Sequence, residues 1–396
     1  MHKLTDYNYT LPERLIAQTS VKPADHAKLL YCKINKQWDM ILKDKYYYDL
    51  PDILPSDSIL FFNNSKVIRA RIPLNNCTVI RNYLPPKAPN RILTLNKWEA
   101  FIYRIISYKD RTFEALVSDD KHFRPGSEII INQQYTLQCI EQMKNWLCIR
   151  LHWWDLNSFL EKFAELPLPP YISYDKNKEP DYQNVFATIP GSVAAPTAWL
   201  HFTESLIHTI QKKWISIQYL TLHVSLGTFK PLNVENIADH EIHGEYVNLD
   251  LSIFKKLYKQ KIVNKKITSV GTTSTRTLES LPYLRKVLNK TQVDMDSETK
   301  KYRNKLSRNI SINEAKKIID RKEWETIFQT KLYIYPWYKT RIIDNMITNF
   351  HLPHTSLLVL VSTFMWYSNR KRSYEHAVQN NYRFYSFGDW MIILND

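Results

Sequence analysis

Residue types suited to acid–base chemistry gather in a few short segments of the chain. The segment DHEIHGEY places His240, His243 and Glu245 close together. Imidazole titrates near neutral pH and a carboxylate can orient it, so the pattern favours general acid–base catalysis. Two histidines three residues apart would also suit a metal if they lay on a helix. Gly244 and the strand-like YVNLDL that follows argue against a long helix, and a purely structural histidine remains an alternative.

Three further histidines stand at the ends of apolar runs. His201 ends AWLH, His223 ends YLTLH, and His351 follows ITNF. Strand ends line the crevices in which α/β proteins bind ligands, so these three are candidates for acid–base work. Each histidine taken alone is more often structural than catalytic.

Glycine is scarce, with six in the chain, and VGTTSTRTLES contains one of them. An apolar strand over Ile267–Val270 runs into Gly271, then Thr272 and Thr273, then a helix-like stretch. The free N–H groups of such a helix start suit a phosphate or carboxylate, and Arg276 would add a bidentate clamp. Ordinary capping of a helix by threonine is the alternative reading.

The chain is strongly basic, which indicates a polyanionic partner such as RNA. It has 396 residues and a formal net charge of +15. Between Lys255 and Lys331 there are 20 Lys or Arg against 8 Asp or Glu, so most of the excess is local. An AT-rich genome, or a solvated lysine-rich helix face, would produce the same excess of basic residues without a polyanionic partner.

Other features limit the class of protein. The four cysteines form no C-x-x-C pair, so we expect free thiols without a disulfide framework or zinc site. Met1–Asn8 is polar, and the longest apolar stretch, Leu357–Trp366, falls short of the ~20 residues of a membrane span. We therefore expect a cytoplasmic protein without a membrane segment. The chain contains no Walker loop, G-x-G-x-x-G or G-x-S-x-G motif.

The pattern of elements predicts a mixed α/β fold. Leu147, Ile149 and Leu151 alternate with more polar residues, and similar β-rich runs fill 73–152, which predicts a small antiparallel β-barrel. Residues 1–72 and 153–396 are expected to form the large α/β domain, with 289–325 as a charged insertion within it. Further strands are expected over Asp57–Phe62 and Ile215–Val224. Helices are expected over Asp155–Glu165 with Asp155 or Asn157 as N-cap, over residues 203–214 capped by Thr203, and over Ser252–Val263.

Several segments, in this order, resemble the S-adenosylmethionine:tRNA ribosyltransferase-isomerase family of queuosine biosynthesis. They are DYNYTLPERLIAQ, LPSDSILFFNNSKVIRARI, PLPPYI, YQNVFA, VAAPTAWLHFT, TLHVSLGTF, DHEIHGEY, VGTTSTRTLES, ITNFHLPHTSLLVLVSTF and YRFYSFGDWMII. The resemblance implies a large α/β domain with an inserted β-barrel. It also implies transfer and isomerisation of the ribosyl group of S-adenosylmethionine onto 7-aminomethyl-7-deazaguanine at the wobble position of tRNA, which yields epoxyqueuosine, adenine and methionine.

The implied chemistry assigns roles to candidate residues. S-adenosylmethionine is the co-substrate, no metal is needed, and the partner is tRNA carrying 7-aminomethyl-7-deazaguanine, bound by a monomer. The acid–base candidates are His201, His223, His243, Glu245 and His351. The substrate-binding candidates are Tyr171, Tyr182 and Phe202 for the sulfonium or a base, and Gln183 and Asn349 for base edges. Arg276 and Thr272 are candidates for the methionine carboxylate or an RNA phosphate, and Thr197, Gly271 and Thr273 are further substrate-binding candidates.

This chain departs from the family pattern at several positions. Trp199, Ser225 and Trp337 stand where the family usually has glycine, Arg69 where it has proline, and Tyr174 where it has arginine. A tryptophan in place of glycine at a ligand-lining turn would fill the pocket. The alternative functions are therefore a diverged or inactive tRNA-binding paralogue, and, more remotely, an S-adenosylmethionine-dependent methyltransferase.

Overall fold

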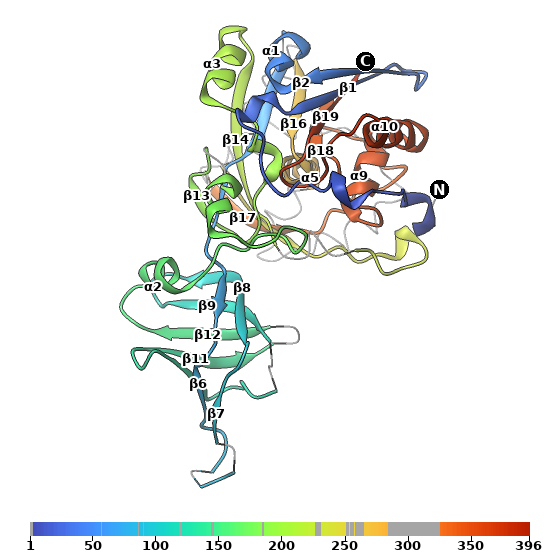
Figure 1. Cartoon of the computed structure of the whole chain (residues 1–396). Helices are drawn as coiled ribbons and strands as arrows, with labels where there is room; N and C mark the ends of the chain where they lie inside the picture. Colours follow the sequence, from blue (N-terminus) through green and yellow to red (C-terminus); the bar gives the residue numbers. More distant parts are fainter. Residues whose placement is uncertain are drawn as a thin grey trace. The chain divides into compact units, whose positions relative to one another are not determined.

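The computed structural model divides into two compact units (Figure 1). Unit 1 contains Met1–Ser65, Pro170–Ile189 and Ala195–Asp396, and unit 2 contains Lys66–Pro169 and Pro190–Ala194. The structure describes residues 3–56, 58–85, 87–89, 91–118, 121–143, 146–183, 186–225, 231–250, 253, 257, 265–283 and 325–396. The expected insertion at 289–325, apart from Glu325, and nearly all of the helix expected at Ser252–Val263 lie outside these residues.

Unit 1 is built on a nine-stranded mixed sheet, which confirms the predicted mixed α/β class. The strand order is β17-β15-β14-β3-β16-β18-β19-β1-β2. The strands are β1 (Lys28–Ile34), β2 (Met40–Tyr46), β3 (Ser58–Asn63), β14 (Ser216–His223), β15 (Glu245–Asp250), β16 (Lys266–Val270), β17 (Glu325–Thr330), β18 (Asn345–Asn349) and β19 (Trp390–Asn395).

Four neighbouring strands at the centre of this sheet, β14, β3, β16 and β18, run parallel to one another. All six residues of β3 are buried, as expected for a strand covered on both faces. Leu60 and Phe62 join a core cluster on one face, while the alternating Ile59 and Phe61 are absent from that cluster. Parallel strands bring their carboxyl ends to one edge of the sheet, and that edge carries the site described below.

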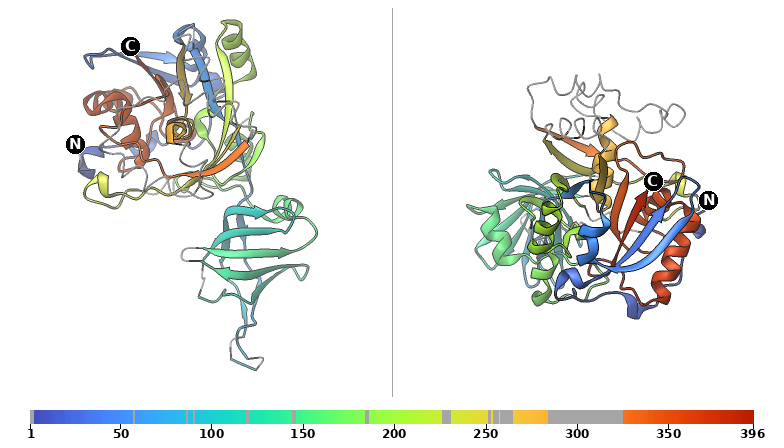
Figure 2. Two further views of the ribbon diagram at one scale, coloured as in Figure 1. Left: turned by 180° about the vertical axis from the view of Figure 1, so that it is seen from behind. Right: turned by 90° about the horizontal axis from the view of Figure 1, so that it is seen from above.

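Helices cover both faces of the sheet (Figure 2). The helices α1 (Leu50–Ile53) and α3 (Glu204–Lys212) contribute to the core cluster that contains Leu60 and Phe62. On the other face, Ser373 of α10 (Tyr367–Gln379) lies 3.8 Å from Cys32 of β1. The described residues of unit 1 also form the helices α5 (Thr272–Ser280) and α9 (Ser356–Met365).

Helix starts agree with the capping predictions. The Thr203 hydroxyl accepts a hydrogen bond from the Leu206 N–H at the start of α3. Asp155 accepts from the N–H groups of Asn157 and Ser158 at the start of α2 (Leu156–Phe163). A side chain that satisfies the otherwise unpaired first N–H groups is the reason that both helices begin there.

Unit 2 contains an eight-stranded antiparallel sheet with the order β5-β8-β9-β12-β11-β10-β6-β7. In β12 the buried residues Leu147, Ile149 and Leu151 alternate with more exposed ones, as the sequence predicted. Its strands are β5 (Arg71–Pro73), β6 (Thr78–Arg81), β7 (Ile92–Thr94), β8 (Glu99–Ser107), β9 (Thr112–Val117), β10 (Ser127–Ile131), β11 (Tyr135–Gln142) and β12 (Leu147–His152). A separate two-stranded sheet joins β4 (Ser65–Val67) and β13 (Ile189–Ser192).

Within the described part of the chain, we find no helix that is both long enough and apolar enough to cross a membrane. All four cysteines are free thiols, as the spacing predicted.

Candidate active site

A pocket that is open to solvent lies at the carboxyl ends of the parallel strands of unit 1. Val224 follows β14, Gly271 follows β16, and Asn349 ends β18, so three of the four parallel strands each deliver a residue to it. α/β proteins characteristically bind ligands in such a crevice. The other lining residues are Tyr171, Ala195, Pro196, Thr197, Ala198, Thr272, Thr273, Thr348, Phe350, His351, Leu352, Thr355, Leu357, Tyr385 and Ser386.

Gly271 forms the turn between β16 and α5, with a φ of +87°. A Cβ atom at this position would lie 2.7 Å from the Cβ of Ala198, so the backbone approach excludes any side chain. The Gly271 N–H donates to the carbonyl of Ile347 in β18 at 2.8 Å. The turn therefore brings the start of α5, with Thr272 and Thr273, to the wall of the pocket.

Asn349 is held in a fixed orientation beside this wall. The Thr197 hydroxyl donates to its Oδ1 at 2.7 Å, and its Nδ2 donates to the carbonyl of Tyr385 at 3.1 Å. Both the oxygen and the nitrogen of the side-chain amide are thereby hydrogen-bonded. It joins three chain segments that line the pocket.

His351 is buried and lies in the pocket wall within hydrogen-bond distance of Thr348. Its Nε2 is 2.8 Å from the Thr348 hydroxyl, and its backbone N–H donates to the Tyr374 hydroxyl at 3.0 Å. Burial lowers the pKa of His351 to about 3. The ring is therefore neutral at physiological pH.

Two tyrosines form an aromatic part of the lining. The rings of Tyr171 and Tyr385 are 4.7 Å apart, and the Tyr171 hydroxyl lies 2.6 Å from that of Ser386. Burial raises the pKa of both phenols, so both stay protonated. A protonated phenol ring offers a cation an aromatic face without a competing negative charge.

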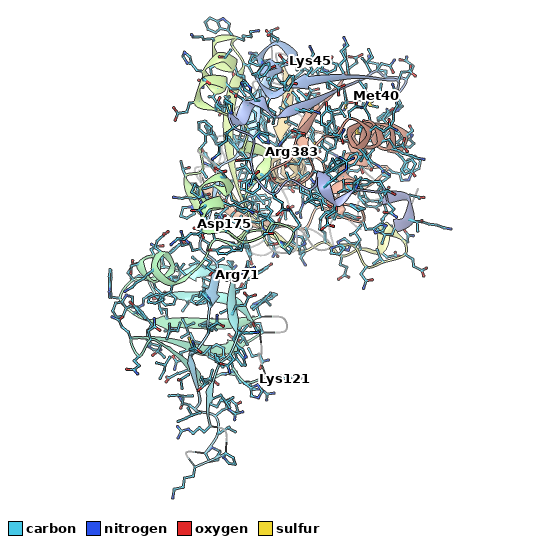
Figure 3. All side chains as sticks on the ribbon, viewed as in Figure 1. Met40, Lys45, Arg71, Lys121, Asp175 and Arg383 are labelled. Carbon is cyan, nitrogen blue, oxygen red and sulfur yellow. The ribbon has the colours of Figure 1, made fainter. Side chains whose placement is uncertain are left out.

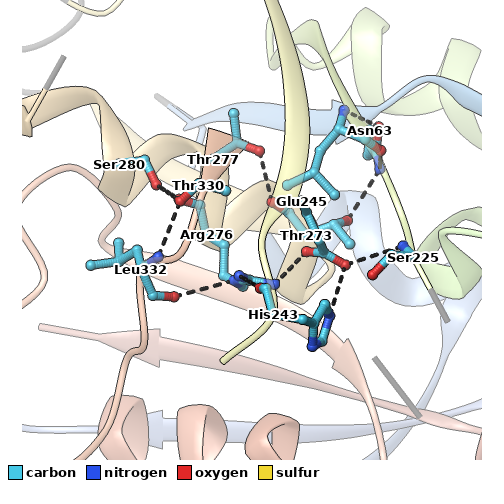
Figure 4. A network of polar contacts seen from close by, with 11 residues as sticks. Asn63, Ser225, His243, Glu245, Thr273, Arg276, Thr277, Ser280, Thr330 and Leu332 are labelled. Atoms are coloured by element: carbon cyan, nitrogen blue, oxygen red, sulfur yellow. Dashed lines mark hydrogen bonds and ion pairs between the residues drawn. The ribbon is translucent and has the colours of Figure 1, made fainter. Parts of the chain in front are cut away.

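Three other predicted residues meet in a buried polar network beside the pocket (Figure 4). The Arg276 guanidinium pairs with the Glu245 carboxylate, and the two side chains are 5% and 1% exposed. Arg276 also donates to the carbonyls of Leu332 and His243 at 3.3 and 3.4 Å. The His243 Nε2 is 3.7 Å from the second carboxylate oxygen of Glu245.

The network reaches the pocket through α5. Thr273 lines the pocket, and its hydroxyl accepts a hydrogen bond from Asn63 at 3.4 Å. Arg276 lies three residues further along the same helix, on nearly the same side. The Arg276–Glu245 pair therefore fixes α5 and, through it, the threonines of the pocket wall.

The remaining predicted residues lie outside the pocket lining. His201 is fully buried, its Nε2 donates to the Gly388 carbonyl at 2.8 Å, and burial lowers its pKa to about 4. Phe202 belongs to the core cluster, and the buried Tyr182 hydroxyl accepts from the Ala195 N–H at 3.3 Å. His223 lies 2.8 Å from the Ser65 hydroxyl, and burial lowers its pKa. Gln183 is half-buried directly after the turn at Pro180–Tyr182.

Sequence reasoning missed several lining residues. Thr348, Thr355, Tyr385 and Ser386 line the pocket but were not among the predicted site residues. All four belong to the segments ITNFHLPHTSL and YRFYSFGDW, which resemble the family. Membership of these segments was the sequence feature that could have identified them.

The glycine replacements lie apart from the pocket lining. Trp199 is 1% exposed and packs into the core cluster, where its ring centroid is 3.7 Å from Phe62 and 5.8 Å from Tyr219. Ser225 donates its backbone N–H to Glu245. Trp337 is 68% exposed and keeps a φ of +79°, a conformation that suits glycine. The replacement at 199 therefore fills the core and leaves the pocket open.

Among the described residues, no group of three or more His, Cys, Asp or Glu side chains is arranged to hold a metal ion.

A parallel-stranded core with a pocket at its carboxyl edge is typical of an α/β protein that binds a ligand at the end of its sheet. More particularly, the chain belongs to the queuosine biosynthesis protein family, whose sequence model matches residues 4–393. This match confirms the resemblance of the ordered segments.

Curated relatives named S-adenosylmethionine:tRNA ribosyltransferase-isomerase are similar over almost their whole length. The relative from Sulfurihydrogenibium sp. (strain YO3AOP1) is 34% identical over 394 residues, which is 99% of this chain and 100% of the relative. The relative from Aquifex aeolicus (strain VF5) is 32% identical, with the same shares covered. A solved structure, S-adenosylmethionine tRNA ribosyltransferase from Thermotoga maritima, is 23% identical with a TM-score of 0.47, covering 98% of this chain and 100% of that one.

Proposed function

We propose that this chain transfers the ribosyl group of S-adenosylmethionine to 7-aminomethyl-7-deazaguanine at the tRNA wobble position and isomerises it. The products are epoxyqueuosine in tRNA, adenine and methionine. Membership of the family over residues 4–393 carries the proposal. The pocket supports it, because the segments that resemble the family supply most of its lining.

The methionine carboxylate of S-adenosylmethionine is assigned to the start of α5. Thr272 and Thr273 line the pocket there, and Gly271 provides no side chain to cap the helix. Unpaired N–H groups and the partial positive charge of a helix start favour a carboxylate. Because Arg276 already pairs with Glu245, we assign it to positioning this helix instead of direct contact.

The sulfonium is assigned to the aromatic lining of Tyr171 and Tyr385. The positive sulfur attracts electron density and makes the adjacent ribose C–H acidic, so a base must remove that proton. His351 is the candidate base, because it lines the pocket and its ring is neutral. The low pKa argues against His351 as the acid that assists adenine departure.

Asn349 and Thr197 are assigned to recognition of a base edge. Their mutual hydrogen bond and the contact with Tyr385 leave the amide in one orientation. A fixed amide discriminates between donor and acceptor patterns better than a rotating one. His243 and Glu245 act with Arg276 as positioning residues, and His201 and His223 hold the elements that border the pocket.

Further assignments follow from the same function. Unit 2 is the inserted domain of the family, with 73–152 as its β-barrel, and 289–325 is a charged insertion within the large domain. The excess of Lys and Arg between Lys255 and Lys331 has the tRNA backbone as its partner. S-adenosylmethionine is a co-substrate and the reaction needs no metal. The chain works as a monomer in the cytoplasm, where tRNA is modified.

The decisive experiment is one incubation of the purified protein with S-adenosylmethionine and tRNA that carries 7-aminomethyl-7-deazaguanine. Free adenine and the digested nucleosides are followed by mass spectrometry. Adenine together with an epoxyqueuosine nucleoside supports the proposal. Bound tRNA without adenine release would move the function to a non-catalytic paralogue, and S-adenosylhomocysteine would indicate a methyltransferase.

A further inference from the structure

Three tryptophans form a cluster on the surface of unit 1. The ring centroids of Trp38 and Trp337 each lie 5.8 Å from that of Trp366. Trp38 is 48% exposed and Trp337 is 68% exposed, while Trp366 is half-buried between them. This tryptophan cluster is separate from the pocket lining and from the polar network.

The three rings come from separate segments that the fold holds together. Trp38 lies in the turn between β1 and β2, Trp366 between α9 and α10, and Trp337 in the segment between β17 and β18. Asn369 donates to the Trp38 carbonyl at 2.9 Å, and Arg372 donates to the carbonyl of Met40, marked in Figure 3, at 3.1 Å. The start of α10 therefore fixes the β1–β2 turn beside Trp366.

All three tryptophans adopt positive φ angles, at 70°, 79° and 69° for Trp38, Trp337 and Trp366. A residue with a Cβ loses roughly 1–2 kcal/mol in the left-handed region, where glycine would lose nothing. Exposure of two large indoles adds an unfavourable contact with water. A bulky side chain at a strained, exposed position is therefore unfavourable for folding alone. The contact among three such indoles from separate segments points to a use at the surface.

The charge around the cluster suits a polyanion. Exposed cations lie close in sequence to all three rings, with Lys36 near Trp38, Lys339 near Trp337, and Lys371 and Arg372 near Trp366. Asp39 and Glu375 are the exposed acids among the described residues in the same stretches, and Glu375 pairs with Lys371. Aromatic rings among cations are the usual platform for unpaired nucleotides.

The cluster also lies within reach of the pocket. Thr355 lines the pocket and caps α9, and Trp366 directly follows the other end of that helix. Ten helical residues span roughly 15 Å. An RNA loop with one nucleotide in the pocket thus has neighbouring nucleotides close to the tryptophans.

We propose that the tryptophan cluster is a stacking platform for unpaired bases of the tRNA substrate, close to the base that enters the pocket. The proposal rests on the tRNA substrate of the proposed function. The indoles provide stacking surface and the nearby lysines attract the phosphates, so the two contributions respond differently to salt.

The test measures the Kd of the full chain for tRNA carrying 7-aminomethyl-7-deazaguanine across a series of salt concentrations. The variants are Trp337→Gly and Trp38→Gly, because glycine suits both backbone conformations and leaves the fold intact. Trp214→Gly is the matched control, since Trp214 is 87% exposed with a φ of 64° and lies after α3, outside the cluster. Lys339→Gln tests the electrostatic part.

We expect Trp337→Gly and Trp38→Gly to raise Kd by about 5- to 150-fold each with an unchanged salt slope. Trp214→Gly leaves Kd unchanged, and Lys339→Gln reduces the salt slope by about one. Unchanged Kd values for the cluster variants overturn the proposal, as does an equal loss with Trp214→Gly. A dimer that dissociates in Trp337→Gly at constant Kd also overturns it, in favour of a second copy of the chain.

The proposed function fails separately from this inference. Adenine release is measured for the same proteins at saturating tRNA. Release with normal Kd values in the cluster variants keeps the enzyme function and rejects the platform. Weakened binding in these variants without adenine release from the parent chain supports the platform and rejects the reaction.

Discussion

Arg276 and Glu245 form a buried ion pair that joins α5 to the strand β15. The pair matters to the site because Thr272 and Thr273, at the start of the same helix, line the pocket. Thirty-one residues separate the partners in sequence. The two family segments DHEIHGEY and VGTTSTRTLES are therefore one structural unit.

Removal of one member of this pair is expected to destabilise the protein more than removal of both. Glu245→Leu or Arg276→Met leaves a buried charge without its partner and costs about 3–5 kcal/mol. The double variant replaces both charges with apolar side chains and recovers most of that loss. Urea unfolding of the four proteins checks this, and additive losses would contradict the coupling.

Thr197→Val is expected to weaken substrate binding through Asn349. Valine has nearly the shape of threonine but cannot donate to the Asn349 Oδ1, which is 2.7 Å from the Thr197 hydroxyl. Loss of one such bond costs about 1–3 kcal/mol, so the KM for S-adenosylmethionine or tRNA rises about tenfold. Thr197→Ser keeps the hydroxyl and serves as the control. Equal KM values for both variants would show that the Thr197–Asn349 hydrogen bond does not contribute to substrate binding.

Stability is expected to fall as pH decreases below neutrality because of buried histidine. The pKa of His201 is about 4 in the folded protein, whereas an unfolded histidine titrates near 6.5. Between these values the unfolded chain binds a proton that the folded chain does not, so the free energy of unfolding decreases with falling pH. His351, with a pKa of about 3, extends the same trend to lower pH.

The measurement compares the free energy of unfolding at pH 7 and pH 5. His201→Gln retains a donor for the Gly388 carbonyl but does not titrate, so its decrease is smaller than that of the parent by about 2 kcal/mol. The same decrease in both proteins would show that His201 is protonated in the folded state at pH 5.

Trp199→Gly restores the residue that the family pattern favours but is expected to damage this chain. Trp199 packs against Phe62, Tyr219 and Phe202 in the core, so its removal opens a cavity and costs about 3–5 kcal/mol. The KM for S-adenosylmethionine remains unchanged, because Trp199 is absent from the pocket lining. Trp199→Phe fills more of the cavity and loses less stability. A lower KM for S-adenosylmethionine in Trp199→Gly would show that the indole hinders binding of this substrate.

Gly271→Ala is expected to abolish most activity, and Gly126→Ala provides a matched control. The two glycines have nearly equal φ angles, +87° and +85°, so both lie in a range that side chains rarely adopt. Only Gly271 has a close neighbour, the Ala198 Cβ at 2.7 Å, while nothing lies within 4 Å at Gly126. The rate of adenine release at saturating substrate distinguishes the two variants. Equal rates would show that Ala198 can shift to accommodate the new methyl group without loss of activity.

Much of the local structure was predictable from sequence, because its causes lie within a few residues. The caps of Thr203 and Asp155 act on N–H groups two or three residues away, and the alternation in β12 reflects a period of two. The ordered family segments likewise identified the family and indicated which stretches supply the site.

Tertiary structure alone decided what each candidate side chain does. His201 and His351 look alike in sequence, yet one contacts Gly388 in the core and the other faces the pocket. Thr197 and Asn349 meet across 152 residues, and three tryptophans from separate segments share one surface. Such contacts depend on strand order, register and packing among distant elements, which a local sequence pattern does not contain.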